Sequence, residues 1–141
     1  MKKHEHPFIV KIIDDFIGNS GHQCIVQNYY DQGDFAEFLK QREGRLFKEE
    51  EITSFLANII MAVHYLNLGN VYHRDLKPAN ILIKKESNGK IYLHLSDFGL
   101  AKNTRPDFTR DSTTLNHIRG TIEYMAPEIL DTPEDKKADY S

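Results

Sequence analysis

The chain has 141 residues, of which 40% are hydrophobic and 28% are charged, a composition typical of one ordinary globular domain. Its 18 basic and 21 acidic residues leave a net charge of −3, which favours neither nucleic acid nor an anionic membrane as a partner. No apolar stretch approaches the roughly 20 residues of a membrane span, and there is one cysteine, Cys24. These features predict an intracellular protein, with the cytoplasm as the expected compartment.

The first predicted element is a β-hairpin. Residues 8–17 and 22–30 are rich in β-branched and aromatic side chains, and the sequence Gly-Asn-Ser-Gly at 18–21 provides a turn between them. A short helix is expected next, because Asp34 with Glu37 three residues later forms a capping box. This helix is predicted to continue to about Arg42.

A longer helix is predicted over residues 49–68. Acidic residues at its start suit the positive end of the helix dipole, and Gly69 suits the C-terminal cap. Apolar residues recur at three- and four-residue spacing and predict one buried stripe. The stripe consists of Ile52, Phe55, Leu56, Ile59, Ile60, Val63 and Leu66.

A second hairpin is predicted from residues 81–83 and 91–95, which flank a polar turn containing Asn88 and Gly89. After Ser96 the sequence shows no periodicity for about 30 residues. A segment of that length without regular structure is uncommon as a passive loop, so it is either disordered or functional.

Three stretches follow one another with spacing that is informative as a set. They are His-Arg-Asp-Leu-Lys-Pro-Ala-Asn at 73–80, Ser-Asp-Phe-Gly-Leu at 96–100 and Gly-Thr-Ile-Glu-Tyr-Met-Ala-Pro-Glu at 120–128. In this order they resemble the signature of the eukaryotic protein kinase family. The resemblance implies an α+β, protein-kinase-like fold, with the last N-lobe strands and the start of the hinge in residues 1–30. Residues 31–141 are then the first half of the mainly helical C-lobe, through the activation segment.

The resemblance also implies transfer of the γ-phosphate of ATP to a protein substrate. Asp75 is expected to orient the substrate hydroxyl and accept its proton, and Lys77 to steady the γ-phosphate. Thr121 is expected to tie Asp75 to Lys77. Lys77 and Thr121 together favour serine and threonine over tyrosine as the acceptor.

Asn80 and Asp97 are expected to bind magnesium, since both offer the hard oxygen atoms that Mg²⁺ prefers. Gly99 is expected to permit the backbone movement that Asp97 needs. Taken one at a time, Asp75, Asn80 and Asp97 are also compatible with ordinary loop positions, and Lys77 with a solvated surface charge. Only their joint occurrence in this order favours a catalytic site.

By the same resemblance, the backbone of Asn28 and Tyr30 is expected to bind the adenine, with Leu82 as the floor beneath the ring. Gln27 takes the gatekeeper position, where such kinases usually carry an apolar side chain. A stack of Ile12, His73 and Phe98 is expected beside the site. Leu82 and Ile12 are equally compatible with plain core positions.

Arg74 directly before Asp75 indicates regulation by phosphorylation, because its guanidinium suits a phosphate on the activation segment. Thr113 and Thr114 are the candidate phosphorylation sites, with Ser112 third. His117 stands where many relatives carry the phosphorylated residue. The alternative is an unmodified polar loop.

The glycine-rich phosphate loop, the ATP-binding lysine and the helix glutamate of a complete kinase do not occur in this sequence. We therefore expect a truncated kinase domain that is inactive and poorly stable by itself. An alternative function is a catalytically inactive kinase fragment that acts as a binding or regulatory module. A small-molecule phosphotransferase is disfavoured by residues 120–128, which resemble a peptide-binding loop.

Overall fold

The computed structural model describes residues 5–98, 102–103 and 121–127. The chain divides into two compact units. Unit 1 comprises residues 1–62 and 78–96, and unit 2 comprises residues 63–77 and 97–141.

The first predicted hairpin is confirmed in unit 1. Strand β1 (Ile12–Ile17) pairs antiparallel with β2 (Gln23–Gln27), and both strands are shorter than expected. The loop is closed by a hydrogen bond from the Gly18 N–H to the His22 carbonyl, at 2.8 Å. Gly21 has a φ of 80°, a left-handed conformation that glycine adopts without steric cost.

Residues 8–17 do not form one strand, in contrast to the prediction. The Val10 N–H donates to the Leu95 carbonyl and the Leu95 N–H donates to the Phe8 carbonyl, each at 2.9 Å. Residues 8–10 therefore pair with the segment around Leu95, whereas β1 pairs with β2. Ile9 and Val10 are buried there, whereas most of β1 is exposed. The chain therefore changes its pairing partner at Lys11, directly after the buried residues Ile9 and Val10.

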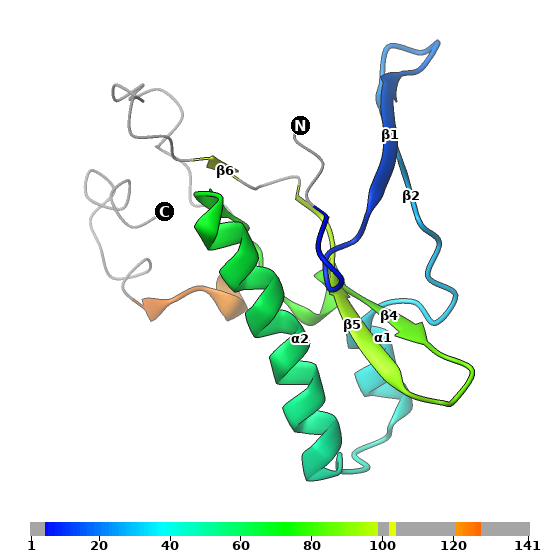
Figure 1. The fold of residues 1–141 in the computed structure, drawn as a ribbon, viewed down its shortest axis with the longest axis vertical. Helices are drawn as coiled ribbons and strands as arrows, with labels where there is room; N and C mark the ends of the chain where they lie inside the picture. The colour runs from blue at the N-terminus through cyan, green and yellow to red at the C-terminus, as the bar shows by residue number, and fades with distance from the viewer. Residues whose placement is uncertain (1–4, 99–101, 104–120, 128–141) are drawn as a thin grey trace. The chain divides into compact units, whose positions relative to one another are not determined.

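The second hairpin is formed by β4 (Ile81–Lys85) and β5 (Ile91–Leu95). Its loop runs from Glu86 to Lys90 with Gly89 at a φ of 84°. The core of unit 1 includes side chains from these strands: Ile81, Ile83, Leu93 and Leu95. Figure 1 shows α1 (Phe35–Gln41) close to this hairpin and the β1–β2 hairpin extending away from it.

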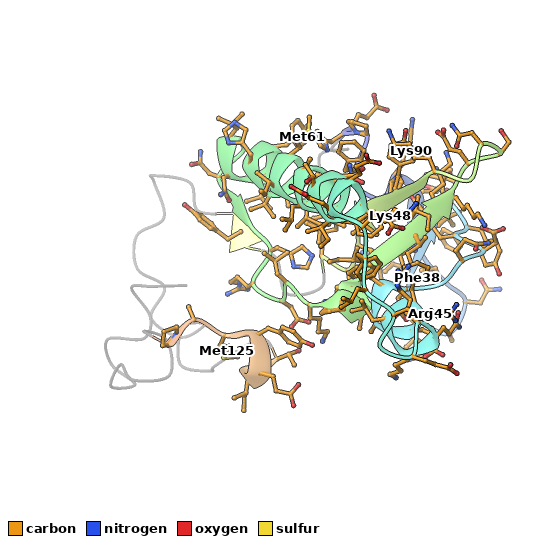
Figure 2. The ribbon with its side chains drawn as sticks, turned by 90° about the horizontal axis from the view of Figure 1, so that it is seen from below. Phe38, Arg45, Lys48, Met61, Lys90 and Met125 are labelled. Atoms are coloured by element: carbon orange, nitrogen blue, oxygen red, sulfur yellow. The ribbon has the colours of Figure 1, made fainter. Side chains whose placement is uncertain are left out.

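The start of α1 confirms the predicted cap. The Asp34 carboxylate accepts a hydrogen bond from the Glu37 N–H at 2.9 Å, and Arg42 is the C-cap. After the helix, the Arg42 guanidinium lies 3.9 Å from the centroid of the Phe47 ring. Four phenylalanine rings pack together at this point: Phe35, Phe38, Phe47 and Phe55. Figure 2 labels Phe38, which belongs to α1, and Arg45, which follows it.

Helix α2 (Glu49–Leu68) has the predicted bounds, but the predicted buried stripe is partly wrong. The buried residues are Phe55, Asn58, Ala62 and Leu66, whereas Ile52, Leu56 and Ile60 are exposed. The buried face includes Asn58 because its side-chain oxygen accepts a hydrogen bond from the Leu93 N–H at 3.0 Å. The left-handed residue after the helix is Asn70, with a φ of 54°, rather than Gly69.

In unit 2, β3 (Val71–Tyr72) pairs with β6 (Lys102–Asn103), and a short 3₁₀ helix, η2, spans Ile122–Tyr124. Within the residues that the structure describes, none of the helices has the length and apolar character that crossing a membrane requires.

Candidate functional site

The loop after β3 is held by a buried histidine. The Asp75 N–H donates to His73 Nδ1 at 3.3 Å, and the His73 ring lies 5.2 Å from the ring of Phe98. The predicted contact between His73 and Phe98 is therefore present. Ile12, the third predicted member of the stack, belongs to unit 1.

Asp75, Lys77 and Thr121 lie together in unit 2. Lys77 Nζ lies 2.9 Å from Asp75 Oδ2 and donates to Thr121 Oγ1 at 2.8 Å. Asp75 Oδ1 accepts hydrogen bonds from the Thr121 hydroxyl at 2.8 Å and from the Thr121 N–H at 3.0 Å. The predicted connection through Thr121 is thus observed across 46 positions of sequence.

This cluster is partly withdrawn from water, which distinguishes it from a surface ion pair. The side chain of Asp75 is 10% exposed and that of Lys77 is 25% exposed. A carboxylate in such a place is stabilised as an anion only if charge and hydrogen-bond donors surround it. Lys77 supplies the charge and Thr121 supplies two donors, so the carboxylate of Asp75 is held in one orientation.

Two residues of the predicted site have left-handed backbones. Arg74 has a φ of 64° and Asp97 has a φ of 57°. Each such conformation in a residue other than glycine costs about 1–3 kcal/mol, and such residues cluster at active sites and switch regions. Glu43 and Asn70, outside the predicted site, have the same backbone conformation, so positive φ alone does not assign a function.

Asn80 ends the short 3₁₀ helix η1 (Pro78–Asn80) and is buried in unit 1. Its carbonyl accepts two hydrogen bonds from Ser96, one from the N–H and one from the hydroxyl, both at 2.9 Å. Ser96 directly precedes Asp97, which belongs to unit 2. Carboxylate and amide oxygens are donors that suit Mg²⁺, so Asn80 and Asp97 fit this ion by their chemistry.

The predicted adenine segment follows β2 in unit 1. Asn28 and Tyr29 are exposed, whereas Tyr30 is half-buried and its ring lies 5.0 Å from the ring of His94. Burial raises the pKa of the Tyr30 hydroxyl above its usual value. Leu82 is half-buried on β4, directly opposite His94 in the strand register.

Several predicted residues lie outside the part of the chain that the structure describes. They are Gly99, Ser112, Thr113, Thr114 and His117. The predictions for these residues stay predictions.

Three buried polar residues in unit 1 were missed by the sequence reasoning: Asn58, His94 and Ser96. Asn58 stands three residues after Phe55 and four before Ala62, so helical spacing alone could have placed it on the buried face. His94 stands between Leu93 and Leu95, and a polar residue alternating with apolar ones in a strand is typical of an exposed position. Ser96 carried no signal apart from its place beside Asp97.

Comparison with known proteins agrees with this arrangement. A family model described as the protein kinase domain matches residues 1–141. Over 135 residues the chain is 39% identical to serine/threonine-protein kinase Nek6 of Oryza sativa subsp. japonica. The matched residues cover 95% of this chain and 23% of that relative. The chain is 35% identical over 136 residues to serine/threonine-protein kinase Nek7 of Arabidopsis thaliana, covering 96% of this chain and 22% of the relative. The chain belongs to the protein kinase domain family, and it spans less than a quarter of the length of these relatives.

Proposed function

We propose that this chain carries the phosphotransfer centre of a serine/threonine protein kinase, which transfers the γ-phosphate of ATP to protein hydroxyl groups. The observation that carries the proposal is the partly buried cluster of Asp75, Lys77 and Thr121. Phosphoryl transfer depends on positioning and charge compensation, and this cluster offers both.

Asp75 orients the hydroxyl group of the substrate and accepts its proton. The hydrogen bonds from Thr121 to Oδ1 support this role because they fix the plane of the carboxylate. Lys77 lies against Oδ2 at 2.9 Å and compensates the negative charge there. As a compact cation it also steadies the γ-phosphate.

On the nucleotide side, the backbone of Asn28 and Tyr30 binds the adenine and Leu82 lies beneath it. Asn80 and Asp97 hold Mg²⁺, which when bound neutralises charge on the phosphate oxygens. The two hydrogen bonds from Ser96 support the role of Asn80, since they fix its backbone.

Arg74 is proposed to receive a phosphate on Thr113 or Thr114, which raises activity. Its place directly before Asp75 supports this role, because a phosphate held there lies beside the catalytic loop. Residues 1–30 are proposed to be the last N-lobe strands and the start of the hinge, and residues 31–141 the C-lobe through the activation segment. We place the activity in the cytoplasm, where ATP is available and the free thiol of Cys24 stays reduced.

The test replaces Asp75 in the full-length protein by Asn, which keeps the size of the side chain but removes its basicity. With Mg·ATP and a mixture of peptides containing Ser, Thr or Tyr, we expect the turnover of Asp75→Asn to fall by about 10²- to 10⁴-fold. ATP binding stays nearly unchanged, and the products are phosphoserine and phosphothreonine.

The matched control is Asp15→Asn, the same chemical change on an exposed residue of β1, which should leave turnover unchanged. Near-normal turnover of Asp75→Asn would exclude the proposed role. Phosphotyrosine as the main product would exclude the serine/threonine specificity.

A further inference from the structure

His94 is a buried residue of β5 that the proposed mechanism does not use. It is 8% exposed, and its ring packs between two aromatic residues from distant segments of unit 1. The ring of Tyr30 lies 5.0 Å away at an interplanar angle of 55°, and the ring of Phe8 lies 6.4 Å away at 68°. His94 therefore contacts Tyr30 in the segment that follows β2.

Hydrogen bonding to the backbone of Tyr92 and Pro7 involves the ring of His94, but one of the two ring nitrogens is left unpaired. Nδ1 of His94 is buried, and the part of the chain that the structure describes offers it no hydrogen-bond partner. An unpaired polar atom of this kind costs about 1–3 kcal/mol, which a phenylalanine or leucine would avoid. A buried group that costs stability is a candidate for a functional role.

The ring of His94 is neutral at physiological pH. Burial lowers the pKa of the imidazole, and the charge of Lys84 acts in the same direction, while hydrogen bonding to the backbone of Tyr92 and Pro7 raises the pKa by less than burial lowers it. A neutral ring packs against Tyr30 and Phe8 without a charge to desolvate.

Tyr30 is held both by its backbone and by its ring. The Tyr30 carbonyl accepts a hydrogen bond from the Gly33 N–H at 3.3 Å, and the Gly33 carbonyl accepts one from the Ile83 N–H at 3.0 Å. The ring of Tyr30 is held by His94, whereas its neighbour Tyr29 is 90% exposed. The contact with His94 therefore restricts the backbone at the position proposed to bind adenine.

We propose that His94 is a positioning residue for the nucleotide site. Its ring supports Tyr30 and holds the backbone of residues 28–30 ready for the adenine of ATP. This inference rests on the proposed kinase function and deepens it. Because His94 acts through Tyr30 and not on the phosphates, its loss is expected to weaken ATP binding without slowing phosphoryl transfer.

The central variant is His94→Leu in the full-length protein, which keeps an apolar side chain at the position but removes the ring. We expect the KM for ATP to rise about tenfold, with kcat within about twofold of the original value. His94→Phe restores a ring and should return the KM to within about twofold. A merely structural role would instead lower the active fraction, and therefore kcat, at unchanged KM.

Tyr92→Leu is the matched control. Tyr92 lies two residues away on β5 and stacks on Phe8 at 6.3 Å, so its loss removes an aromatic ring from the same strand. We expect this variant to leave the KM for ATP unchanged. An equal rise of KM in Tyr92→Leu, or an unchanged KM in His94→Leu, would overturn the proposal.

Calorimetric binding of a non-hydrolysable ATP analogue separates this proposal from the proposed function. If the original protein binds the analogue but transfers no phosphate, the proposed function fails, while a tenfold weaker binding by His94→Leu still supports the role of His94. If His94→Leu binds the analogue as tightly as the original protein, the role of His94 fails while the kinase function stands. A protein that does not bind the analogue at all would refute both.

Discussion

The two β-hairpins of unit 1 are closed by the same kind of loop but differ in burial. In each loop a glycine with positive φ, Gly21 or Gly89, donates its N–H to the carbonyl three residues earlier, at 2.9 Å and 2.8 Å. Ile17 of the first hairpin is nevertheless 69% exposed, whereas Leu95 of the second is fully buried. The loop sequence therefore determines that two strands pair, and the neighbours of the strands determine whether they enter the core.

The neighbours of the second hairpin are segments distant in sequence. The backbone of Phe8 and Val10 pairs with the end of β5, and the Gly33 carbonyl pairs with β4. On α2, the side chain of Asn58 contacts the Leu93 N–H. These contacts give β4 and β5 partners on both edges, which isolated two-stranded hairpins lack.

The largest difference between the hairpins is expected from truncating one apolar residue in each. Leu95→Ala should lower the free energy of unfolding by about 2–5 kcal/mol, because it removes buried methyl groups and leaves a cavity. Ile17→Ala should change it by no more than about 0.5 kcal/mol. Urea denaturation of the full-length variants measures both. Similar losses in the two variants would contradict the comparison.

A smaller loss in the free energy of unfolding is expected from removing the side-chain contact between α2 and the second hairpin. Asn58→Leu should cost about 1–3 kcal/mol, because the buried Leu93 N–H loses its acceptor. Hydrogen exchange at the Leu93 amide should accelerate in the same variant. Gln23→Leu, an exposed change on β2, is the control and should leave the unfolding free energy nearly constant.

Replacing the left-handed glycine should destabilise the two loops by the same amount. Gly21→Ala and Gly89→Ala should each cost about 1–2 kcal/mol, because the left-handed backbone becomes strained. No heavy atom lies within 4 Å of an added Cβ at either position, so packing contributes nothing to the cost. Asn should restore part of the stability at both sites. Thermal melts that show a clear difference between the two alanine variants would mean that the loops are not equivalent.

The smallest effect on stability is expected from a change of pH, through the imidazole of His94. The pKa of His94 is lowered by burial from an ordinary value of 6.5, so the unfolded chain binds more protons than the folded one just below that pH. The stability that depends on neutral His94 is present above about pH 6.5 and is lost as the pH falls through the folded-state pKa. His6, whose pKa is also lowered by burial, acts in the same direction. Melting temperatures at pH 7.5 and 5.5 should differ less in His94→Phe than in the original protein.

Elements with local signals could be predicted from the sequence. Asp34 caps α1 through a contact only three residues long, and the glycine loops close their hairpins within five residues. The bounds of α2 follow from acidic residues at its start and an apolar period along its length. The grouping of Asp75, Lys77 and Thr121 was predictable because the motifs that contain them occur together in one family.

Features that depend on distant contacts could not be predicted in this way. The partner change at Lys11 depends on the end of β5, more than 80 positions later. Ile52, Leu56 and Ile60 have the period of a buried face, yet α2 buries the face that contains Asn58. His94 belongs to no motif, and the motif that contains Ser96 does not indicate its partner, so their contacts with Tyr30 and Asn80 required coordinates.

The anchoring of Gly33 and Asp34 also has a consequence for changes of chain length. The Gly33 carbonyl bonds to β4, while the Asp34 side chain caps α1, so the path from Gln27 to Gly33 is fixed at its end. A residue inserted between Gly33 and Asp34 would put the Gly33 contact to β4 and the Asp34 cap of α1 out of register, so one of the two would break. The Glu86–Lys90 loop is exposed and satisfies its own hydrogen bonds, so inserted sequence such as an epitope tag can be accommodated there.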